Sequence, residues 1–489
     1  MRRTCFGLST TKLILFSTIE AGEQEGGIVN SYFDQFIKKN PHPHRPFWER
    51  PALSRRQFFR IVGTGVTGYA LLEAARPLRL MASLPVTPVN TARNCIYILL
   101  AGAPSHVDSF DLKEGPWTPA SFNPTSYGDL RFPQALLPNV ANHINDIAIV
   151  RSARSWALVH SLGQTWVQIG RNPASALGPI SPNIGSVVAI EKASERTPSD
   201  ILPGFVSFNA GGSQVGAGYF PVTYAPFRVQ PLAAGLANTV HPAAAGGQAR
   251  WNTRMQLLHL LDDPLRQNSP LGQPAQDLDG FYTSASQLMY NEAVQSAFSF
   301  AATERAPFGN TTFGDACLLA TKVLRANLGT RFIQITLGGW DHHSNIYTAL
   351  PPLATTFDRG YGALLDGLNE AGLFGETLVV VAGEFGRTVG ALNNQAGRDH
   401  FMQQSILFAG AGVRGGRAIG STDGTGANTA DPGWSRNRDV RPEDVEASIY
   451  SALGINWTTI RNDDPLGRGF EYVPFANYDI YGPINELWA

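Results

Sequence analysis

The chain has 489 residues, 43% of them hydrophobic, which is enough to bury a large core. Its 38 Lys and Arg residues nearly balance its 39 Asp and Glu residues, so the net charge of −1 offers no basic excess for a nucleic-acid partner. The three cysteines make no spaced pair, which argues against a disulfide framework, while 50 glycines and 33 prolines indicate a loop-rich enzyme or binding domain.

The amino-terminal part of the chain carries an export pattern. Residues 54–60, Ser-Arg-Arg-Gln-Phe-Phe-Arg, precede a mildly apolar run at 61–72 and resemble a twin-arginine signal. The alternative is an ordinary basic turn before an amphipathic helix. We expect 1–53 to be an extension with little fold of its own and 54–84 to be the signal. The resemblance implies a protein that is periplasmic or otherwise exported, and we expect no transmembrane span after the signal.

Four apolar runs are typical of strands buried on both faces: Asn94–Leu100, 147–150, 331–337 and Thr377–Ala382. Between the last two, apolar residues recur at three- and four-residue steps from Leu353 to Leu368, which predicts a helix that stops at Gly372. Strand, helix and strand in alternation predict an α/β domain over 92–489, with a mostly parallel sheet and helices on both faces.

The middle of the chain, about 205–307, is rich in Gly, Ala and Pro and leads into a helical stretch at 281–301. We interpret this segment as an insertion or lid over the carboxyl edge of the sheet.

Residue types that bind metals follow the third and fourth of these strands, where open α/β sheets bind ligands. Asp341 and His343 follow the third strand, and His342 is the alternative to His343. Glu384 follows the fourth strand as a further ligand, and Arg387 is placed to bind an oxyanion through its forked guanidinium. The alternatives are a polar surface loop for the first group and a structural Glu–Arg ion pair for the second.

Two more elements add candidates to the same edge. His400 stands just before a further predicted strand at 405–409, with Asp399 as its supporting partner or another ligand. Asp108 and His106 follow the first strand, where the alternative is a polar strand-to-helix connection. Mixed carboxylate and imidazole ligands favour Zn²⁺, Mn²⁺ or Fe, whereas oxygen ligands alone would favour Ca²⁺ or Mg²⁺.

Seven pieces of the chain form a wider pattern: 102–111, 313–320, 338–343, 384–387, 397–400, 412–416 and 449–454. Together they resemble the bacterial exported family catalogued as domain of unknown function 1501, within the alkaline phosphatase superfamily. That family has no established reaction, so the resemblance implies an alkaline-phosphatase/sulfatase-like fold and no particular substrate. Where sulfatases carry an Asp-His metal pair this chain has Glu384 and Phe385, which implies one metal, or two held differently.

The resemblance also implies a position for the nucleophile. Sulfatases and phosphatases place Cys, Ser or Thr at the start of a helix, and the similar segment here has His160 and Ser161 at that point. Ser161 is then a candidate nucleophile, and His160 a ligand or an acid/base; structural roles are the alternative. The segment holds no Cys, so a sulfatase with a Cys-derived formylglycine is excluded.

These observations favour a metal-dependent hydrolase of phosphate or sulfate esters, acting on a small-molecule or polysaccharide ester outside the cytoplasm. In this interpretation Arg387 stabilises the oxyanion, and Ser161 or a water on the metal attacks. The ligands of the metal are Asp341, His343, Glu384 and His400, with Asp108 as an addition. The rivals are a non-catalytic metal-binding protein of an envelope or polysaccharide system, and a scaffold without metal.

Overall fold

The computed structural model describes residues 86–489 except 238, 241–245, 267–271, 273–281 and 283–284. The predicted extension at 1–53 and the predicted signal at 54–84 lie outside these residues. In the part of the chain that is described, no helix combines the length and the apolar character needed to cross a membrane.

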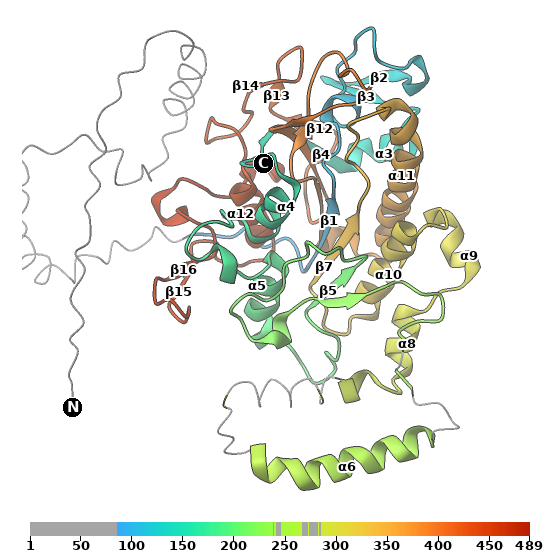
Figure 1. The fold of residues 1–489 in the computed structure, drawn as a ribbon, viewed down its shortest axis with the longest axis vertical. Coiled ribbons are helices and arrows are strands. Elements are labelled where there is room, and N and C mark those ends of the chain that lie inside the picture. Colours follow the sequence, from blue (N-terminus) through green and yellow to red (C-terminus); the bar gives the residue numbers. More distant parts are fainter. Residues whose placement is uncertain (1–85, 238, 241–245, 267–271, 273–281, 283–284) are drawn as a thin grey trace, which may run out of the picture. The chain divides into compact units, whose positions relative to one another are not determined.

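An eight-stranded sheet forms the centre of the domain, in the order β12-β4-β11-β8-β1-β7-β5-β6 (Figure 1). Its strands are β1 (Asn94–Leu100), β4 (Ile147–Arg154), β5 (Phe205–Phe208), β6 (Phe227–Val229), β7 (Phe332–Leu337), β8 (Thr377–Ala382), β11 (Gln403–Ala409) and β12 (Arg417–Ile419). All neighbouring pairs are parallel except the two that β11 makes with β8 and β4. The predicted mostly parallel sheet is confirmed.

Helices and small ladders surround this sheet. The helices include α3 (Pro138–Asn142), α4 (His160–Ile169), α5 (Ile184–Glu191), α6 (Gly247–Arg266), α8 (Glu292–Phe298), α9 (Ala302–Arg305), α10 (Thr312–Ala326), α11 (Ile346–Glu370) and α12 (Pro442–Ala452). The two-stranded ladders pair β2 (Pro124–Tyr127) with β3 (Leu130–Pro133), β9 (Gly386–Arg387) with β10 (His400–Phe401), β13 (Ser421–Thr422) with β14 (Thr429–Asp431), and β15 (Ile460–Arg461) with β16 (Phe470–Glu471).

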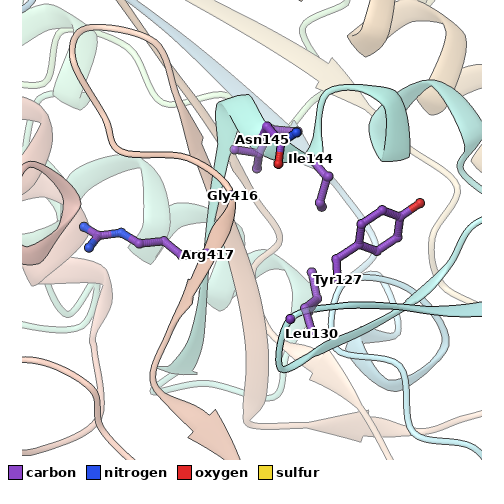
Figure 2. Close-up of a pocket in the computed structure, with 8 residues that line it drawn as sticks. Tyr127, Leu130, Ile144, Asn145, Gly416 and Arg417 are labelled. Carbon is purple, nitrogen blue, oxygen red and sulfur yellow. The ribbon is translucent and has the colours of Figure 1, made fainter.

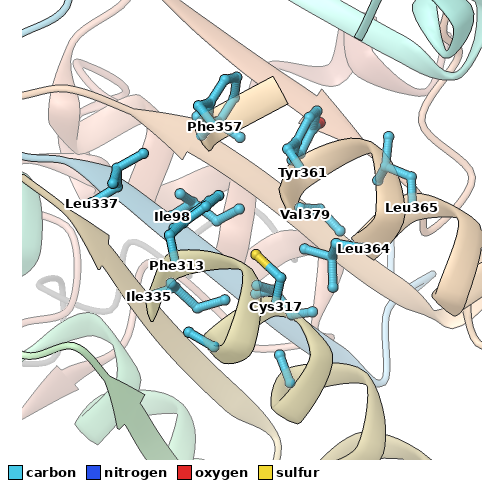
Figure 3. Close-up of a cluster of buried hydrophobic side chains, with 14 of the residues drawn as sticks. Ile98, Phe313, Cys317, Ile335, Leu337, Phe357, Tyr361, Leu364, Leu365 and Val379 are labelled. Atoms are coloured by element: carbon cyan, nitrogen blue, oxygen red, sulfur yellow. The ribbon is translucent and has the colours of Figure 1, made fainter. Parts of the chain in front are cut away.

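The core lies on both faces of the sheet, because successive side chains of a strand point to opposite sides. In β1, Ile96, Ile98 and Leu100 belong to one buried cluster, and Cys95, Tyr97 and Leu99 to the other. Figure 3 shows the first cluster, where side chains of α10 and α11 pack over Ile98 and its neighbours in the sheet. Each fully buried large apolar side chain there contributes about 1.5–3 kcal/mol to stability.

Helix α11 confirms the predicted helix and extends it. The apolar periodicity placed the start near Leu353, but the helix begins at Ile346 and continues through Pro351 and Pro352. Its end agrees with the prediction, since Gly372 follows the last turn with a φ of +69°. A glycine tolerates this left-handed conformation because it has no Cβ.

The segment at 205–307 differs in part from the predicted insertion. Its first residues form β5 and its residues 227–229 form β6, so two strands of the main sheet lie inside it. The part outside the sheet therefore starts after β6 and includes α6 and α8. The helical stretch predicted at 281–301 lies partly outside the described residues, and α8 occupies its second half.

Gly102 marks a very close approach between the loops that follow β1 and β7. Its φ is +108°, and a Cβ built on it would lie 2.7 Å from the backbone N of Asp341 and 2.8 Å from that of Trp340. Backbone atoms cannot move aside as a flexible side chain would. The contact therefore requires glycine, and it brings the β7 loop against the end of β1.

Replacing Gly102 with alanine should lower the free energy of unfolding by more than about 2 kcal/mol, because strained φ and steric overlap add together. Gly128→Ala is the matched control, since Gly128 has a φ of +56° but no heavy atom within 4 Å of the added Cβ. The control should cost only about 1–2 kcal/mol. Denaturant titration of both variants measures the difference, and equal losses would contradict the close-approach argument.

Helix α12 supports α4 through a buried carboxylate. Glu443 accepts hydrogen bonds from the indole N–H groups of Trp156 and Trp166, each at 3.0 Å. Burial raises the pKa of Glu443 to about 7. Burial also raises the pKa of Glu446, one turn along, to about 8. In the folded chain both carboxyl groups therefore stay protonated up to these raised pKa values. In the unfolded chain they lose their protons at a lower pH, near the ordinary pKa of glutamate.

Because the folded state binds more protons between these pKa values, the free energy of unfolding should fall as pH rises from about 5 to about 8, by a few kcal/mol in order of magnitude. Glu443→Gln should flatten this profile, whereas Glu370→Gln, at the exposed end of α11, should leave it unchanged. Denaturant titrations at several pH values measure the slope. A stability that rises through this pH range would contradict the assignment.

Candidate metal centre

Four side chains that can bind a metal meet beyond the carboxyl ends of the parallel strands. They are His160 at the start of α4, Asp341 and His343 in the loop after β7, and His400 in β10, and one ligand atom of each lies within 4.8 Å of the others. The short β9–β10 ladder sets His400 opposite Arg387. Residues far apart in the sequence are thus brought together at the edge where α/β sheets bind ligands.

The three histidines share one arrangement at their Nδ1 atoms. Each Nδ1 lies beside an oxygen that has no proton to donate: Glu384 Oε1 at 2.6 Å from His160, Asp399 Oδ1 at 2.7 Å from His343, and the Leu158 carbonyl at 2.7 Å from His400. Each Nδ1 must therefore donate its N–H. In the neutral rings this leaves every Nε2 with a free lone pair, as a metal ligand requires.

The three Nε2 atoms converge on one carboxylate oxygen. They lie 3.2, 3.0 and 3.6 Å from Asp341 Oδ1 for His160, His343 and His400, respectively. The Nε2 atoms of His343 and His400 are only 3.0 Å apart, and that of His160 is buried without a hydrogen bond. Facing lone pairs repel unless a proton or a cation lies between them. Three imidazoles and one carboxylate fit Zn²⁺, Mn²⁺ or Fe, and are poorly suited to Ca²⁺ or Mg²⁺.

The charges around the cluster affect the ligands unequally. The hydrogen bond to Glu384 raises the pKa of His160 above its ordinary value, against the effect of burial. Burial lowers the pKa of His400, and the positive charge of Arg387 acts in the same direction. Burial tends to raise the pKa of Asp341, but the hydrogen bond from Arg387 and the charges of Arg387, His160 and His343 together outweigh it and keep that pKa below the usual range. Asp341 is therefore a carboxylate, and a second proton on His400 is disfavoured.

Glu384 lies beside the cluster, where it orients His160 through a hydrogen bond to Nδ1. Its side chain is fully buried, and its Oε1 accepts from His160, from the Gly102 N–H at 2.9 Å and from Gln164 Nε2 at 3.0 Å. The next residue, Phe385, packs its ring against those of His160 and His400, with centroids 4.9 and 4.7 Å away. Phe385 therefore forms an apolar wall behind two of the imidazoles.

Arg387 is fully buried and engages all five of its N–H groups. Its Nε donates to the Ala103 carbonyl at 2.9 Å, and its Nη2 to the Gly102 carbonyl and, at 2.6 Å, to Asp341 Oδ1. Its Nη1 lies 3.2 Å from the Arg398 carbonyl and 3.4 Å from His343 Nε2. The guanidinium predicted to bind a substrate oxyanion therefore has four of its N–H groups on the chain's own oxygens, and the fifth faces His343 Nε2, the lone pair that a metal would take.

Asp108 is not brought to the cluster. It forms a fully buried ion pair with Arg398, at 2.5 and 3.1 Å, and also accepts from Ser105 and Tyr347. His106 is buried with its Nε2 at 2.9 Å from the Gly426 carbonyl, and it is not in the cluster. The first-strand candidates thus shape the loop after β1.

Of the two adjacent histidines that the sequence left open, the structure brings His343 into the cluster. Ser161 is exposed next to His160 in the first turn of α4, which has no side-chain cap. The sequence analysis missed Gln164 and the Leu158 carbonyl. Gln164 stands one turn after His160 on the same helix face, a spacing that could have indicated it. A main-chain acceptor such as Leu158 leaves no mark in the sequence.

A cavity of about 230 Å³ lies elsewhere, lined by residues of β2, β3, the turn at Ile144–Asp146 and the start of β12. Figure 2 shows Tyr127, Leu130 and Ile144 around it, with the side chain of Arg417 extending away from them. None of its lining residues belongs to the histidine cluster. We therefore place no chemistry in this cavity.

The sequence profile of the family described as "Protein of unknown function (DUF1501)" matches residues 92–473. No curated protein matches the chain. Similar solved structures include the lipoteichoic acid synthase LtaP from Listeria monocytogenes, at 9% identity and TM-score 0.36, with 79% of this chain and 77% of that chain covered. A putative sulfatase from Bacteroides thetaiotaomicron has 10% identity and TM-score 0.34, with 79% and 75% covered. Alkaline phosphatase from the Antarctic bacterium TAB5 has 16% identity and TM-score 0.32, with 67% and 93% covered. Likenesses of this strength carry no argument about substrate.

Replacing Glu384 with glutamine should weaken metal binding by about 10–100-fold, because an amide neither orients nor polarises His160 as a carboxylate does. Asp399→Asn is the matched comparison: it makes the same change behind His343, but its carboxylate is 56% exposed and already screened by water. It should cost less affinity. Competition with a chromophoric chelator measures both, and an unchanged affinity in Glu384→Gln would contradict the supporting role.

Proposed function

The chain belongs to the DUF1501 family, and we propose that it is a metal-dependent hydrolase of phosphate or sulfate esters that acts outside the cytoplasm. The observation that carries the proposal is the convergence of three Nε2 lone pairs on Asp341. The side chains of Asp341 and His343 are 46% and 40% exposed, so a substrate can reach the cluster from solvent.

The metal would be held by His160, Asp341, His343 and His400, and the donor set favours Zn²⁺, Mn²⁺ or Fe. A metal here would polarise the ester and neutralise charge on its oxygens. The chain's own contribution is orientation. Glu384 and Asp399 hold two of the imidazoles in the tautomer that exposes Nε2, and the Leu158 carbonyl holds the third.

Ser161 is our candidate nucleophile. It is exposed and adjacent to His160, at the amino end of α4, where the uncapped N–H groups favour an anion. A serine hydroxyl is weak at neutral pH and needs a neighbouring base or cation to activate it. Water attacking from the solvent side is the alternative. For Asp108 we propose that its ion pair with Arg398 holds the loop after β1 in place.

A second candidate function is metal binding without catalysis, in an envelope or polysaccharide-associated protein. Arg387 and Arg398 are both buried and donate to the chain's own oxygens. No N–H group of Arg398 and only one N–H group of Arg387 is left by these oxygens for an ester oxyanion, a contact that many ester hydrolases use. This observation favours the binding protein, and turnover decides between the two.

The test uses the exported protein purified without a His tag, assayed on nitrophenyl phosphate, bis(nitrophenyl) phosphate and nitrophenyl sulfate after reloading with Zn²⁺ or Mn²⁺. We expect turnover that a chelator removes and the metal restores. His400→Ala should lower both metal content and turnover by at least about 10-fold, as loss of a ligand does. His143→Ala is the control, because His143 pairs with Asp146 and Asp366 away from the cluster.

Metal retained at the wild-type level in a folded His400→Ala variant would show that the site assignment is wrong. Bound metal without turnover on any ester of the panel would contradict the hydrolase and support the binding protein. Ser161→Ala separates the two attack routes, because only a serine nucleophile loses turnover while the metal content stays unchanged.

A further inference from the structure

We propose that the guanidinium of Arg387 is a built-in second cation of this centre, so that the site takes one metal ion and excludes a second. The inference rests on the metal centre of the proposed function and adds the number of ions and the role of one residue. The position in question lies next to the Asp341 carboxylate, where either a second metal ion or the Arg387 guanidinium could bind.

The first argument is that the guanidinium cannot leave its place. Its acceptors come from three separate strand ends: carbonyls after β1, the Asp341 carboxylate after β7, and the Arg398 carbonyl before β10. The side chain is fully buried, so a departing guanidinium would leave several backbone carbonyls without donors. Unpaired buried carbonyls are costly, which keeps the charge in position.

The second argument is the location of the charge. Nη2 lies 2.6 Å from Asp341 Oδ1 and Nη1 lies 3.4 Å from His343 Nε2, so the guanidinium contacts two ligands of the first ion directly. Metal ions that share a carboxylate in two-metal sites lie about 3.5–4 Å apart. The guanidinium therefore occupies the space on its side of Asp341 that a second ion would need. A divalent ion placed there would also meet its repulsion in a poorly solvated site.

The third argument concerns the ligands that a second ion would need. Asp108 is fully buried in its ion pair with Arg398, and Asp341 Oδ1 accepts from Arg387 at 2.6 Å. Among the described residues, the histidine cluster is the one group of three or more His, Cys, Asp or Glu side chains arranged to hold an ion. Two buried arginines thus bind acids that a second metal would otherwise use.

The same contacts show what would follow if the guanidinium were removed. The carbonyls of Gly102, Ala103 and Arg398, and Asp341 Oδ1, would then face a small cavity lined by oxygen atoms. Oxygen ligands of this kind suit Ca²⁺. Loss of Arg387 should therefore create a second cation site of harder character beside the histidine site.

The first experiment measures the stoichiometry and environment of metal in the full-length wild-type protein. Loading with Zn²⁺ and plasma mass spectrometry should give one equivalent per chain, and Mn²⁺ loading should give the electron paramagnetic resonance spectrum of an isolated ion. Two equivalents, or the spectrum of a coupled pair, would overturn the inference while leaving the hydrolase standing. One equivalent without ester turnover would support the inference and remove the hydrolase. No bound metal would overturn both.

The second experiment compares Arg387→Ala with Arg151→Ala, loaded with Zn²⁺ and then titrated with Ca²⁺. Arg151 is also buried and donates to backbone carbonyls of Gly420 and Asp129, but these groups are not in the histidine cluster. We expect Arg387→Ala to bind an additional equivalent of Ca²⁺ that the wild type and Arg151→Ala do not bind. A folded Arg387→Ala variant with no additional Ca²⁺ would overturn the inference. If this variant does not fold, the wild-type stoichiometry decides the question.

Discussion

The backbone of one residue, Gly102, connects Glu384 and Arg387, the two buried side chains on which the centre depends. The Gly102 N–H donates to the buried Glu384, and its carbonyl accepts from the buried Arg387. Glu384 in turn holds His160, while Arg387 holds Asp341. The arrangement is available because β1 lies between β8 and β7 in the sheet, so the loop that follows it reaches both neighbours.

The three imidazoles are supported in different ways, and this difference shapes the centre. The support behind His160 is a fully buried carboxylate, that behind His343 is an exposed carboxylate, and that behind His400 is a main-chain carbonyl. A buried carboxylate transmits the most negative charge to its histidine, since water screens it least. The carbonyl transmits the least. The basicity of Nε2 should therefore decrease from His160 through His343 to His400, although all three ligands are histidines.

Sequence reasoning found the strands because they are buried on both faces. An uninterrupted apolar run such as Asn94–Leu100 needs no knowledge of its neighbours, and the bounds of β1 and β8 agree with the prediction. It also placed Asp341, His343 and His400 at one edge, since each adjoins a predicted strand. It could not assign Asp108, whose partner Arg398 is 290 positions away in the chain. Ion pairs of that range depend on loop conformations that no local pattern specifies, and the acceptors of Arg387 could not be predicted for the same reason.

The reversed direction of β11 explains why His400 reaches the centre although it precedes a strand. Because β11 runs antiparallel to β8 and β4, its first residue lies at the edge where its neighbours end. The turn after β11 then lies at the other edge, where Gly410 approaches the start of β8 so closely that a Cβ would lie 2.2 Å from the Thr377 carbonyl. The two ends of this strand consequently serve different purposes, one for the chemistry of the centre and one for the packing of the sheet. An insertion before the strand would displace His400 from the centre, whereas one at 411–416 would lie at the opposite edge of the sheet.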